Sequence, residues 1–401
     1  MSDGPTRMTS GGRNKPPRLL YVVNEDYAFL MNRLPMARAA RDAGFEVHVA
    51  TNVKDGRAAI EAEGFVLHRI PFKRGGLSPL AAVPAMLAIR KLETAIEPVI
   101  VHHSGLQCCV FGSLAALDRD FPTVNAITGL GYIFTSSSLL SRLLKQAMAF
   151  LLPRLLNRAH STILVQNPDD RDALIALGAS AARITLIPGS GVDADRLKPL
   201  PEPDGPITIG FAGRLLADKG VRALVAAHDL LRGQGHDFHL IIAGNPDPAN
   251  PASVSREEVE GWTRRPGITW LGHIEDIATL WRAAHIATLP SHREGLPGAL
   301  MEAAACGRPL VATDAAGCRE ICIANQTGLL VPIEDPPALA EAILRLAQSP
   351  DLRARFGAAA RRLVEEKLSA RIIGRSIVEL YDKLVREEPA ALPAGISRPA
   401  H

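Results

Sequence analysis

The feature that most constrains the fold is a repeated alternation of short apolar runs with helical segments. Apolar runs of strand length lie at 19–23, 47–50 and 65–70, with helix-like segments between them. This alternation favours βαβ units, which build a parallel sheet covered by helices. A second series of the same kind begins with the run 207–211. The sequence therefore predicts the α/β class, with two parallel sheets.

The stretch between the two series is dense in Pro, Gly and charged residues, a composition typical of an interdomain linker. The first residues are polar and lack the apolar core of a signal peptide, so we expect them to be disordered. The predicted parts, in order, are a disordered leader (1–16), a first domain (17–196), a linker (197–206), a second domain (207–370), a C-terminal helix (371–387) and a loose tail (388–401).

The most distinctive stretch is 289–309, LPSHREGLPGALMEAAACGRP. An apolar run ends there in a loop, and a helix is expected from about Pro297 to Gly307, because Pro marks helix starts and Gly marks helix ends. Gly295 has no side chain, so a ligand can approach the loop backbone closely. The start of a helix concentrates free N–H groups and partial positive charge, which suits a phosphate.

Two carboxylates accompany this helix start, Glu294 before it and Glu302 inside it. That spacing alone is common by chance, but the surrounding stretch SHREGLPGALMEAAACGRPLVATDAAGCREI resembles the nucleotide-sugar signature of the family-4 retaining glycosyltransferases. The resemblance implies the GT-B fold, in which two Rossmann-like domains face a cleft and the last helix crosses back to the first domain. It also implies an acceptor on the first domain and a donor nucleotide on the second.

The donor side of the expected site follows the run 207–211. Gly213-Arg214 and Lys219-Gly220 match the family's donor-binding Arg and Lys. A departing nucleoside diphosphate gains negative charge, which a guanidinium fork and an ammonium group can neutralise. The alternative is that Arg214 and Lys219 are two surface cations in a loop without a function in binding. The resemblance makes Arg214, Lys219 and Glu294 catalytic residues, and it assigns donor contacts to Gly213, Gly244, Gly295, Leu296 and Glu302.

The acceptor side of the site is expected in three loops of the first domain. Asn32 stands where the family usually has a His, although Asn can still hydrogen-bond a hydroxyl. For His102 a packed or capped histidine remains the alternative. The segment ITGLGYIFTSSS resembles a loop of the subgroup that acts on lipid-linked sugars in bacterial surface-polysaccharide assembly. The acceptor-side residues that the resemblance implies are Glu25, Asp26, Asn32, His102, Gly129 and Gly131.

The distribution of charged and apolar residues indicates whether nucleic acid or a membrane surface is a partner. The first 200 residues carry a net positive charge and the remainder a net negative charge, an imbalance too mild to indicate nucleic acid. Segment 139–159 is apolar and basic without an acidic residue, and Pro153 is expected to break it into two helical pieces. It fits an anionic membrane surface or, alternatively, a core-packing helix pair. The expected location is cytoplasmic, peripheral on the inner face of the plasma membrane.

Neither a metal nor a cofactor is expected. Two Asp-x-Asp pairs, Asp118 with Asp120 and Asp193 with Asp195, do not follow a strand that faces a phosphate-binding helix, so we do not interpret them as metal ligands. The five cysteines lack zinc-site spacing and are expected to be buried thiols in a reducing cytosol.

The resemblance thus predicts transfer of a hexose or N-acetylhexosamine from a UDP-sugar to a lipid-linked saccharide in polysaccharide biosynthesis. Three alternatives stay open. One is a soluble small-molecule acceptor, and another is a GT-B enzyme that is not a transferase, such as a UDP-sugar epimerase. The third is a protein that binds a sugar nucleotide without catalysis.

Overall fold

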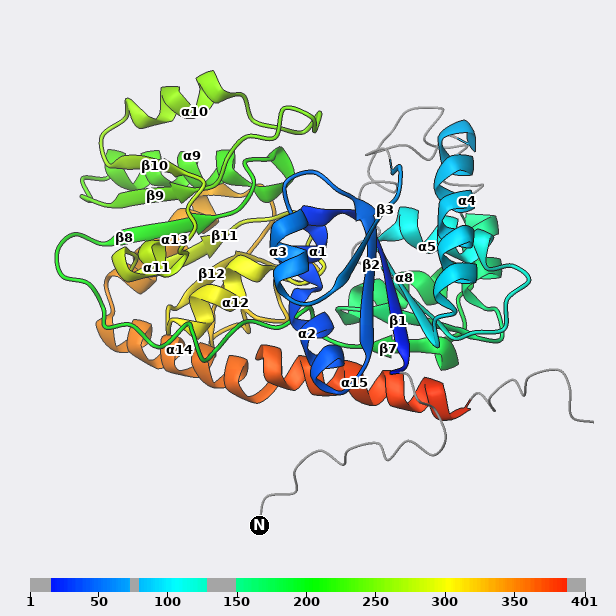
Figure 1. Cartoon of the computed structure of the whole chain (residues 1–401). Helices are drawn as coiled ribbons and strands as arrows, with labels where there is room; N and C mark the ends of the chain where they lie inside the picture. Colours follow the sequence, from blue (N-terminus) through cyan, green and yellow to red (C-terminus); the bar gives the residue numbers. More distant parts are fainter. Residues whose placement is uncertain (1–15, 73–78, 128–148, 388–401) are drawn as a thin grey trace, which may run out of the picture.

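The structure, a computed structural model, describes residues 16–72, 79–127 and 149–387. Strands and helices alternate along both halves of the chain, as the sequence predicts (Figure 1). The first half contains β1 (Arg18–Glu25), α1 (Asp26–Asn32), α2 (Leu34–Asp42), β2 (Glu46–Asn52), α3 (Arg57–Ala62), β3 (Val66–Arg69), α4 (Pro79–Ile96), β4 (Ile100–Ser104), α5 (Leu106–Ala115), β5 (Thr123–Ala126), β6 (Ser161–Val165), α8 (Pro168–Ala176) and β7 (Ile184–Leu186).

The second half follows the same pattern and ends in a run of helices. It contains β8 (Thr208–Ala212), α9 (Val221–Gly233), β9 (His239–Ala243), α10 (Arg256–Thr263), β10 (Ile268–Gly272), α11 (Ala278–Ala283), β11 (Ile286–Leu289), α12 (Gly298–Ala305), β12 (Leu310–Thr313), β13 (Gly328–Val331), α13 (Pro336–Ala347), α14 (Pro350–Leu363) and α15 (Ala370–Glu387).

The first sheet, in the described residues, has seven parallel strands in the order β3-β2-β1-β4-β5-β6-β7. Its interior strand β1 is buried on both faces: successive side chains point to opposite sides of the sheet, and both sides are covered. Leu20 and Val22 pack into the core on one face, and Leu19, Tyr21 and Val23 pack into the core on the other. This two-sided burial explains the continuous apolar run in the sequence.

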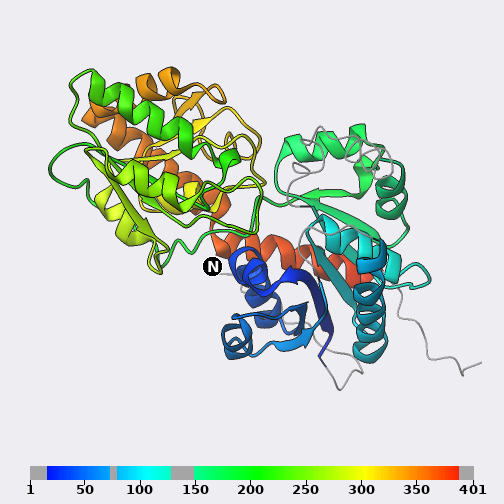
Figure 2. The ribbon, with the colours of Figure 1, turned by 90° about the horizontal axis from the view of Figure 1, so that it is seen from above.

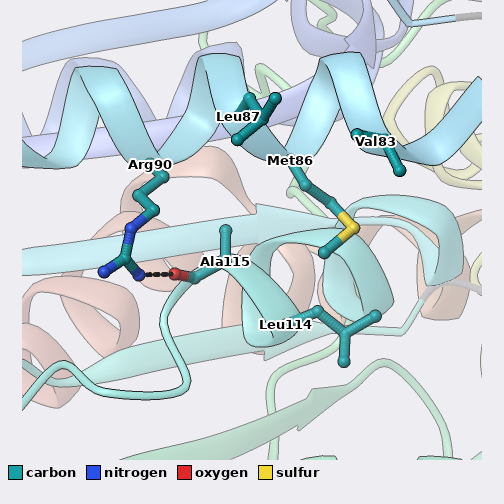
Figure 3. A pocket seen from close by; sticks show the side chains of 6 residues that line it. All are labelled: Val83, Met86, Leu87, Arg90, Leu114 and Ala115. Atoms are coloured by element: carbon teal, nitrogen blue, oxygen red, sulfur yellow. Dashed lines mark hydrogen bonds between the residues drawn. The ribbon is translucent and has the colours of Figure 1, made fainter.

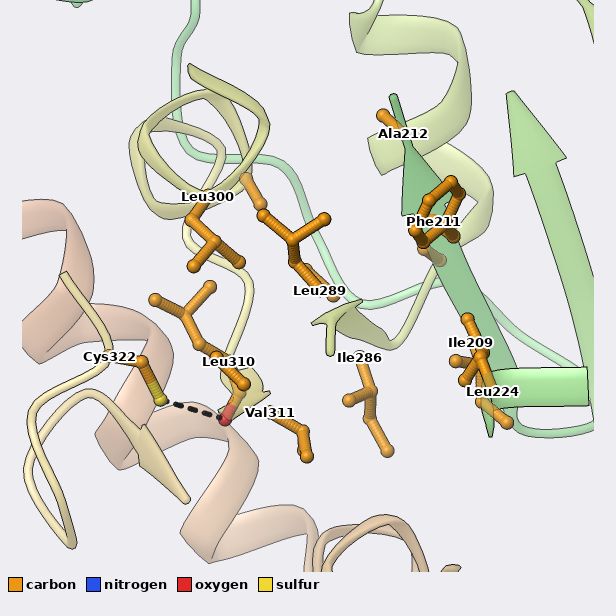
Figure 4. Packing of buried hydrophobic residues seen from close by; sticks show 14 of the residues in the cluster. Ile209, Phe211, Ala212, Leu224, Ile286, Leu289, Leu300, Leu310, Val311 and Cys322 are labelled. Atoms are coloured by element: carbon orange, nitrogen blue, oxygen red, sulfur yellow. Dashed lines mark hydrogen bonds between the residues drawn. The ribbon is translucent and has the colours of Figure 1, made fainter. Parts of the chain in front are cut away.

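The second sheet has six described strands in the order β10-β9-β8-β11-β12-β13, again all parallel. Side chains from β8, β11 and β12 meet those of α9 and α12 in one core, for example Phe211, Leu224 and Leu300 (Figure 4). The predicted α/β class with two parallel sheets is therefore confirmed. Viewed from above, the two sheets and their helices form separate lobes (Figure 2).

Two segments of the chain, around Val192 and around Ser369, run side by side where they join the two lobes. The Val192 N–H donates to the Leu368 carbonyl (2.9 Å), and the Ala370 N–H donates to the Val192 carbonyl (2.8 Å). Gly191 has a positive φ of 78°, and a side chain there would collide with the Ala370 backbone. The segment 197–206 lies along the second domain, where the Leu200 N–H donates to the Cys306 carbonyl (3.0 Å).

Helix α15 begins at this crossing and packs against the first domain (Figures 1 and 2). Its buried face carries Ile373, Ile377 and Tyr381, which join the core that also holds Leu19 and Tyr21. The C-terminal helix therefore belongs to the packing of the first sheet, although α14 before it packs on the second domain.

The prediction that Pro153 breaks its helix is wrong for the described part of the segment. Residues 149–156 form one helix that passes through the proline. A proline inside a helix costs about 3 kcal/mol, but Leu152, Leu155 and Leu156 are all buried on this helix. Burial of a large apolar side chain contributes about 1.5–3 kcal/mol, so tertiary packing outweighs the local penalty.

Candidate active site

The site is assembled from loops at one edge of the second sheet. Because its strands are parallel, their carboxyl ends meet at the same edge, where ligands of open α/β sheets usually bind. The turn after β8 carries Arg214 and Lys219, and the loop 290–297 between β11 and α12 carries Glu294. We call residues 290–297 the donor loop. All three predicted catalytic residues thus follow strands β8 and β11, which are hydrogen-bonded neighbours.

Lys219 and Glu294 are in direct contact. The Lys219 Nζ atom lies 2.5 Å from Glu294 Oε1, and the Ser291 hydroxyl donates to the same oxygen (2.7 Å). Both side chains are largely buried, with 21% of Lys219 and 11% of Glu294 exposed. Charge-assisted hydrogen bonds of this kind are short and strong, so they hold both groups at the start of α12. Sequence reasoning did not single out Ser291.

Arg214 takes a different partner on the same edge. Its Nη1 atom lies 3.1 Å from the Asp247 carboxylate, which follows β9. The guanidinium side chain is 48% exposed, whereas the Asp247 side chain is 15% exposed. Sequence reasoning missed Asp247, and the available signal was an acid three residues beyond Gly244 in the loop after a strand.

Close backbone approaches explain several glycines around the site. Gly220 has a φ of 69° at the start of α9, and a Cβ atom there would lie 1.9 Å from the Pro290 carbonyl oxygen. A Cβ atom on Gly244 would lie 1.8 Å from the Gly213 carbonyl oxygen. Only glycine fits such contacts. Gly244 therefore has a packing role, and the contact of Gly213 and Gly244 with a nucleotide stays a prediction.

Helix α12 begins and ends close to the predicted bounds. Pro297 is its N-cap residue and Gly307, with a φ of 73°, follows its last turn. Glu302 lies inside the helix, where burial raises the pKa of its carboxyl to about 7, although Arg196 lowers it in part. Leu296 lies against Gly189, just before the point where the chain crosses to the second domain at Val192. A Cβ atom on Gly189 would come within 2.8 Å of Leu296 Cδ2. The donor loop therefore touches the chain that joins the two domains.

The first domain also contacts the donor loop directly. The Asn167 side chain, at the start of α8, donates to the carbonyl oxygens of Gly295 (2.6 Å) and Glu294 (3.4 Å). Asp170 on the same helix pairs with Arg293 of the donor loop. Asn167 is the N-cap residue of α8 and Asp170 lies in its first turn, both common positions for these residue types, so the sequence alone does not distinguish them as part of a site.

On the acceptor side, Asp26 and Glu25 are engaged within the first domain. Burial alone would raise the pKa of the Asp26 carboxyl, but hydrogen bonds from the backbone N–H groups of Gly56, Lys54 and Tyr27 outweigh it and lower the pKa. Glu25 pairs with the exposed Lys54 ammonium group at 2.9 Å. Asp26 therefore ties the start of α1 to the loop 53–56, and its acceptor contact stays a prediction.

His102 lies in the interior of the first domain. Its Nδ1 atom is 2.6 Å from the Tyr381 hydroxyl of α15, and that hydroxyl is 2.8 Å from the Tyr21 hydroxyl. Burial holds the pKa of the imidazole well below its usual range, and the Arg33 guanidinium lowers it further. His102 is therefore a packed histidine, the alternative that the sequence left open. The Asn32 side chain, by contrast, is exposed and donates to the nearby Ala28 carbonyl (3.1 Å), while the Asn32 backbone carbonyl accepts from the Ser190 hydroxyl.

The structure describes only part of the remaining residues predicted for the acceptor side and the membrane surface. Gly129 and Gly131, with residues 139–148 of the proposed membrane segment, lie outside the described residues. In the described remainder, the Arg154 guanidinium stacks on the exposed Phe150 ring. Arg158 instead donates to the Ala116 carbonyl at the end of α5 (2.9 Å), a structural contact. No helix among the described residues has the length and apolar character needed to cross a bilayer.

One shallow hollow lies elsewhere, between α4 and α5 of the first domain (Figure 3). Figure 1 places these helices on the side of the first domain that is turned away from the second domain. The Arg90 guanidinium closes one end by donating to the Ala115 carbonyl (3.0 Å). The hollow therefore has no part in the site around the donor loop. Its lining residues are Val83, Met86, Leu87, Arg90, Leu114 and Ala115.

Comparisons with known proteins agree with this arrangement. The profile described as Glycosyl transferase 4-like domain matches residues 34–189, and the profile described as Glycosyl transferases group 1 matches residues 206–349. Two parallel α/β sheets in this order define the GT-B class. The chain belongs to the group 1 glycosyltransferases, family 4.

Individual relatives extend along most of the chain. The capsular polysaccharide biosynthesis glycosyltransferase CapM of Staphylococcus aureus is 22% identical over 356 residues, or 86% of this chain and 92% of CapM. The N,N'-diacetylbacillosaminyl-diphospho-undecaprenol alpha-1,3-N-acetylgalactosaminyltransferase of Campylobacter jejuni is 24% identical over 371 residues, 88% of this chain and 95% of that enzyme. Anabaena Alr3699/HepE, solved with UDP-glucose, superposes with a TM-score of 0.73 at 20% identity, covering 91% of this chain and 99% of its own.

Proposed function

We propose that this glycosyltransferase moves a hexose or N-acetylhexosamine from a UDP-sugar to a lipid-linked saccharide in polysaccharide biosynthesis, with retention at the anomeric carbon. The observation that carries the proposal is the Lys219–Glu294 contact at the start of α12. It sets a cation and a sugar-binding carboxylate side by side, where free helix N–H groups favour an anion. The structural similarity to HepE, which was solved with UDP-glucose, supports a UDP-sugar as the donor. The name of CapM supports a role in polysaccharide biosynthesis, and the name of the Campylobacter enzyme supports a lipid-linked acceptor.

The reaction explains why cations stand at this edge. When the bond between the anomeric carbon and the diphosphate oxygen breaks, the diphosphate gains negative charge. Groups fixed in advance around that charge stabilise the transition state more than the ground state. Lys219 would reach the diphosphate as a point charge and Arg214 as a two-pronged donor. Each cation has a carboxylate partner, Glu294 or Asp247, so the diphosphate would share or replace these contacts.

The same loops would orient the rest of the donor. The N–H groups of Gly295 and Leu296 would bind phosphate, Glu294 would accept hydrogen bonds from sugar hydroxyls, and Glu302 would hold the ribose. With two cations and a helix start available, we propose that no divalent ion takes part. Adding a chelator would then leave the rate unchanged, and a loss of activity that Mg²⁺ restores would contradict this part of the proposal.

The acceptor would enter from the first domain, past Glu25, Asp26 and Asn32. Arg154 and the exposed Phe150 are an apolar and basic pair on the helix 149–156, which supports contact of segment 139–159 with an anionic membrane surface. On this proposal the enzyme works at the cytoplasmic face of the membrane.

The deciding experiment combines a donor panel with a lipid acceptor. Purified protein is incubated with UDP- and GDP-linked hexoses and N-acetylhexosamines, together with bacterial membrane lipid extract. We expect one UDP-sugar to be consumed only when extract is present, giving a lipid product heavier by one sugar in mass spectrometry. Conversion of a UDP-sugar without acceptor would indicate an epimerase, and binding of UDP without turnover across the panel would indicate a non-catalytic protein.

A further inference from the structure

The donor loop is held from the first domain by a buried side chain. Asn167 is completely buried, and its Oδ1 atom accepts from the Asp170 N–H (2.7 Å), which fixes the orientation of the amide. Its Nδ2 atom therefore faces the donor loop and donates to the Gly295 carbonyl oxygen at 2.6 Å. Capping α8 needs only Oδ1, so the Nδ2 contact with the other domain is an additional function of this residue.

An ion pair reinforces this contact. Asp170 has no exposed surface and pairs with Arg293, the residue before Glu294. Nδ2 of Asn167 also donates to the second Asp170 oxygen (3.0 Å). A buried carboxylate without a counter-charge is strongly unfavourable, so Asp170 stabilises the arrangement in which Arg293 reaches across. A longer pair, Arg319 with Asp169 at 3.6 Å, spans the same boundary.

The second domain also packs against the same peptides. A Cβ atom on Gly317 would lie 2.6 Å from the carbonyl oxygens of both Glu294 and Gly295. The Glu294 N–H donates to the Ala316 carbonyl (3.0 Å). The backbone of the donor loop at Glu294 and Gly295 is therefore enclosed between α8 of one domain and the loop after β12 of the other.

This enclosure sets the direction of the free N–H groups. In a trans peptide the N–H points away from the C=O, so the bond from Asn167 to the Gly295 carbonyl directs the Leu296 N–H away from α8. Among the residues that the structure describes, no group accepts a hydrogen bond from the N–H of Gly295 or Leu296. Two donors are thus oriented and left available.

We propose that Asn167 and Asp170 are positioning residues for the donor: from the first domain they hold the donor loop in the shape that presents its N–H groups to a nucleoside diphosphate. The inference rests on the proposed function, because it takes the diphosphate as the ligand of those N–H groups. It gives the acceptor domain a part in donor binding, so the second domain alone does not complete the donor site.

The test separates capping of α8 from contact with the donor loop. Asn167→Ser keeps an N-cap oxygen and removes the Nδ2 donor, and Asp170→Asn removes the charge at nearly constant shape. Asp172→Asn is the matched control, since Asp172 lies on the same helix, is exposed and, among the described residues, pairs only with its neighbour Arg171 at 2.9 Å. The probes are UDP binding by calorimetry and hydrogen exchange of the peptide that spans 290–297.

We expect Asn167→Ser and Asp170→Asn to weaken UDP binding about five- to tenfold and to speed exchange in the donor loop, with exchange in α13 unchanged. Arg293→Gln should do the same, and adding it to Asp170→Asn should cost little more, because the two residues form one contact. Unchanged UDP affinity in Asn167→Ser and Asp170→Asn overturns the proposal, whether or not exchange accelerates.

These outcomes are distinct from failure of the proposed function. If no sugar is transferred from any donor, yet UDP binding and loop exchange respond as expected, the positioning role stands and the transferase proposal fails. If transfer occurs and both variants bind UDP and turn over like the control, the transferase proposal stands and the positioning role fails.

Discussion

The two domains use their ionisable side chains in different ways. In the second domain, Lys219 and Glu294 meet at the sheet edge and remain partly exposed. In the first domain, Asp26 accepts three backbone N–H bonds and His102 is enclosed with two tyrosine hydroxyls. A charged group that is saturated inside one domain stabilises that domain, whereas one held at an open edge is available to a ligand. The contrast predicts that substitution of Lys219 affects turnover and that substitution of His102 affects stability.

The largest expected effect is that of Lys219→Ala. Removing a preorganised cation from a departing diphosphate typically costs about 10²–10³ in rate, and here Glu294 would also lose its partner. The initial rate with the donor found in the panel should fall by about 10³, while the circular dichroism spectrum is unchanged. Lys198→Ala is the control, because Lys198 is exposed and makes a long ion pair with Asp195, at 3.6 Å. A rate within twofold of the control would remove Lys219 from the mechanism.

Arg214→Ala should reduce turnover by about 10², somewhat less than Lys219→Ala, because Arg214 is half exposed and solvent screens its charge. Arg222→Ala is matched to it: Arg222 has a similar exposed fraction, 50%, and its own carboxylate partner, Glu258, at 2.7 Å. The two variants should unfold at similar temperatures and differ only in rate. Equal rates would show that Arg214 is an ordinary surface cation.

His102→Ala should have the opposite profile. The substitution leaves a cavity and removes one of the two partners of the Tyr381 hydroxyl, so the free energy of unfolding should fall by about 2–4 kcal/mol. The KM for the donor should stay the same. Urea unfolding beside His239→Ala, an exposed histidine, measures the difference. An acceptor KM changed tenfold with unaltered stability would place His102 in the acceptor site after all.

The same histidine makes stability depend on pH. Burial holds the pKa of His102 below 6.5 in the folded protein, so the unfolded chain takes up a proton first as the pH falls. Stability is complete above about pH 6.5 and declines below it, by up to about 1.4 kcal/mol per pH unit. His102→Ala should reduce this dependence, which urea midpoints between pH 5 and 8 would show.

The smallest expected effect concerns Glu302. Burial raises the pKa of its carboxyl to about 7, and an ionised carboxylate accepts hydroxyl hydrogen bonds more strongly than the protonated form. If it holds the ribose, the KM for the UDP-sugar should fall about three- to fivefold as the pH rises from 6 to 8. Glu302→Gln should show a flat profile. A pH dependence that survives this substitution belongs to another group.

Much of the fold could be predicted because its causes are local. The apolar run 19–23 is continuous since β1 is buried on both faces, and α12 begins after Pro297 and ends before Gly307. Pro153 shows the limit of local rules: residues 149–156 stay helical through it because three leucines are packed in the interior.

The candidate site divides along the same line. Arg214, Lys219 and Glu294 could be named from the sequence, because short stretches around a turn or a helix start carry their pattern. Asp247 and Asn167 could not be named as site residues. Their partners lie 33 and 128 positions away along the chain, and each residue has an adequate local explanation as part of a loop or a cap.

The sequence by itself determined the α/β alternation, the two-domain division and the family, since these follow from periodicity and from motifs within a few residues. Only the tertiary structure decided which charged groups are buried and which meet across the domains. The physical reason is that burial and long-range pairing are properties of the packed chain. A carboxylate such as Asp170 reads as a helix-start acid in the sequence and becomes a buried partner of Arg293 only when the two domains pack together.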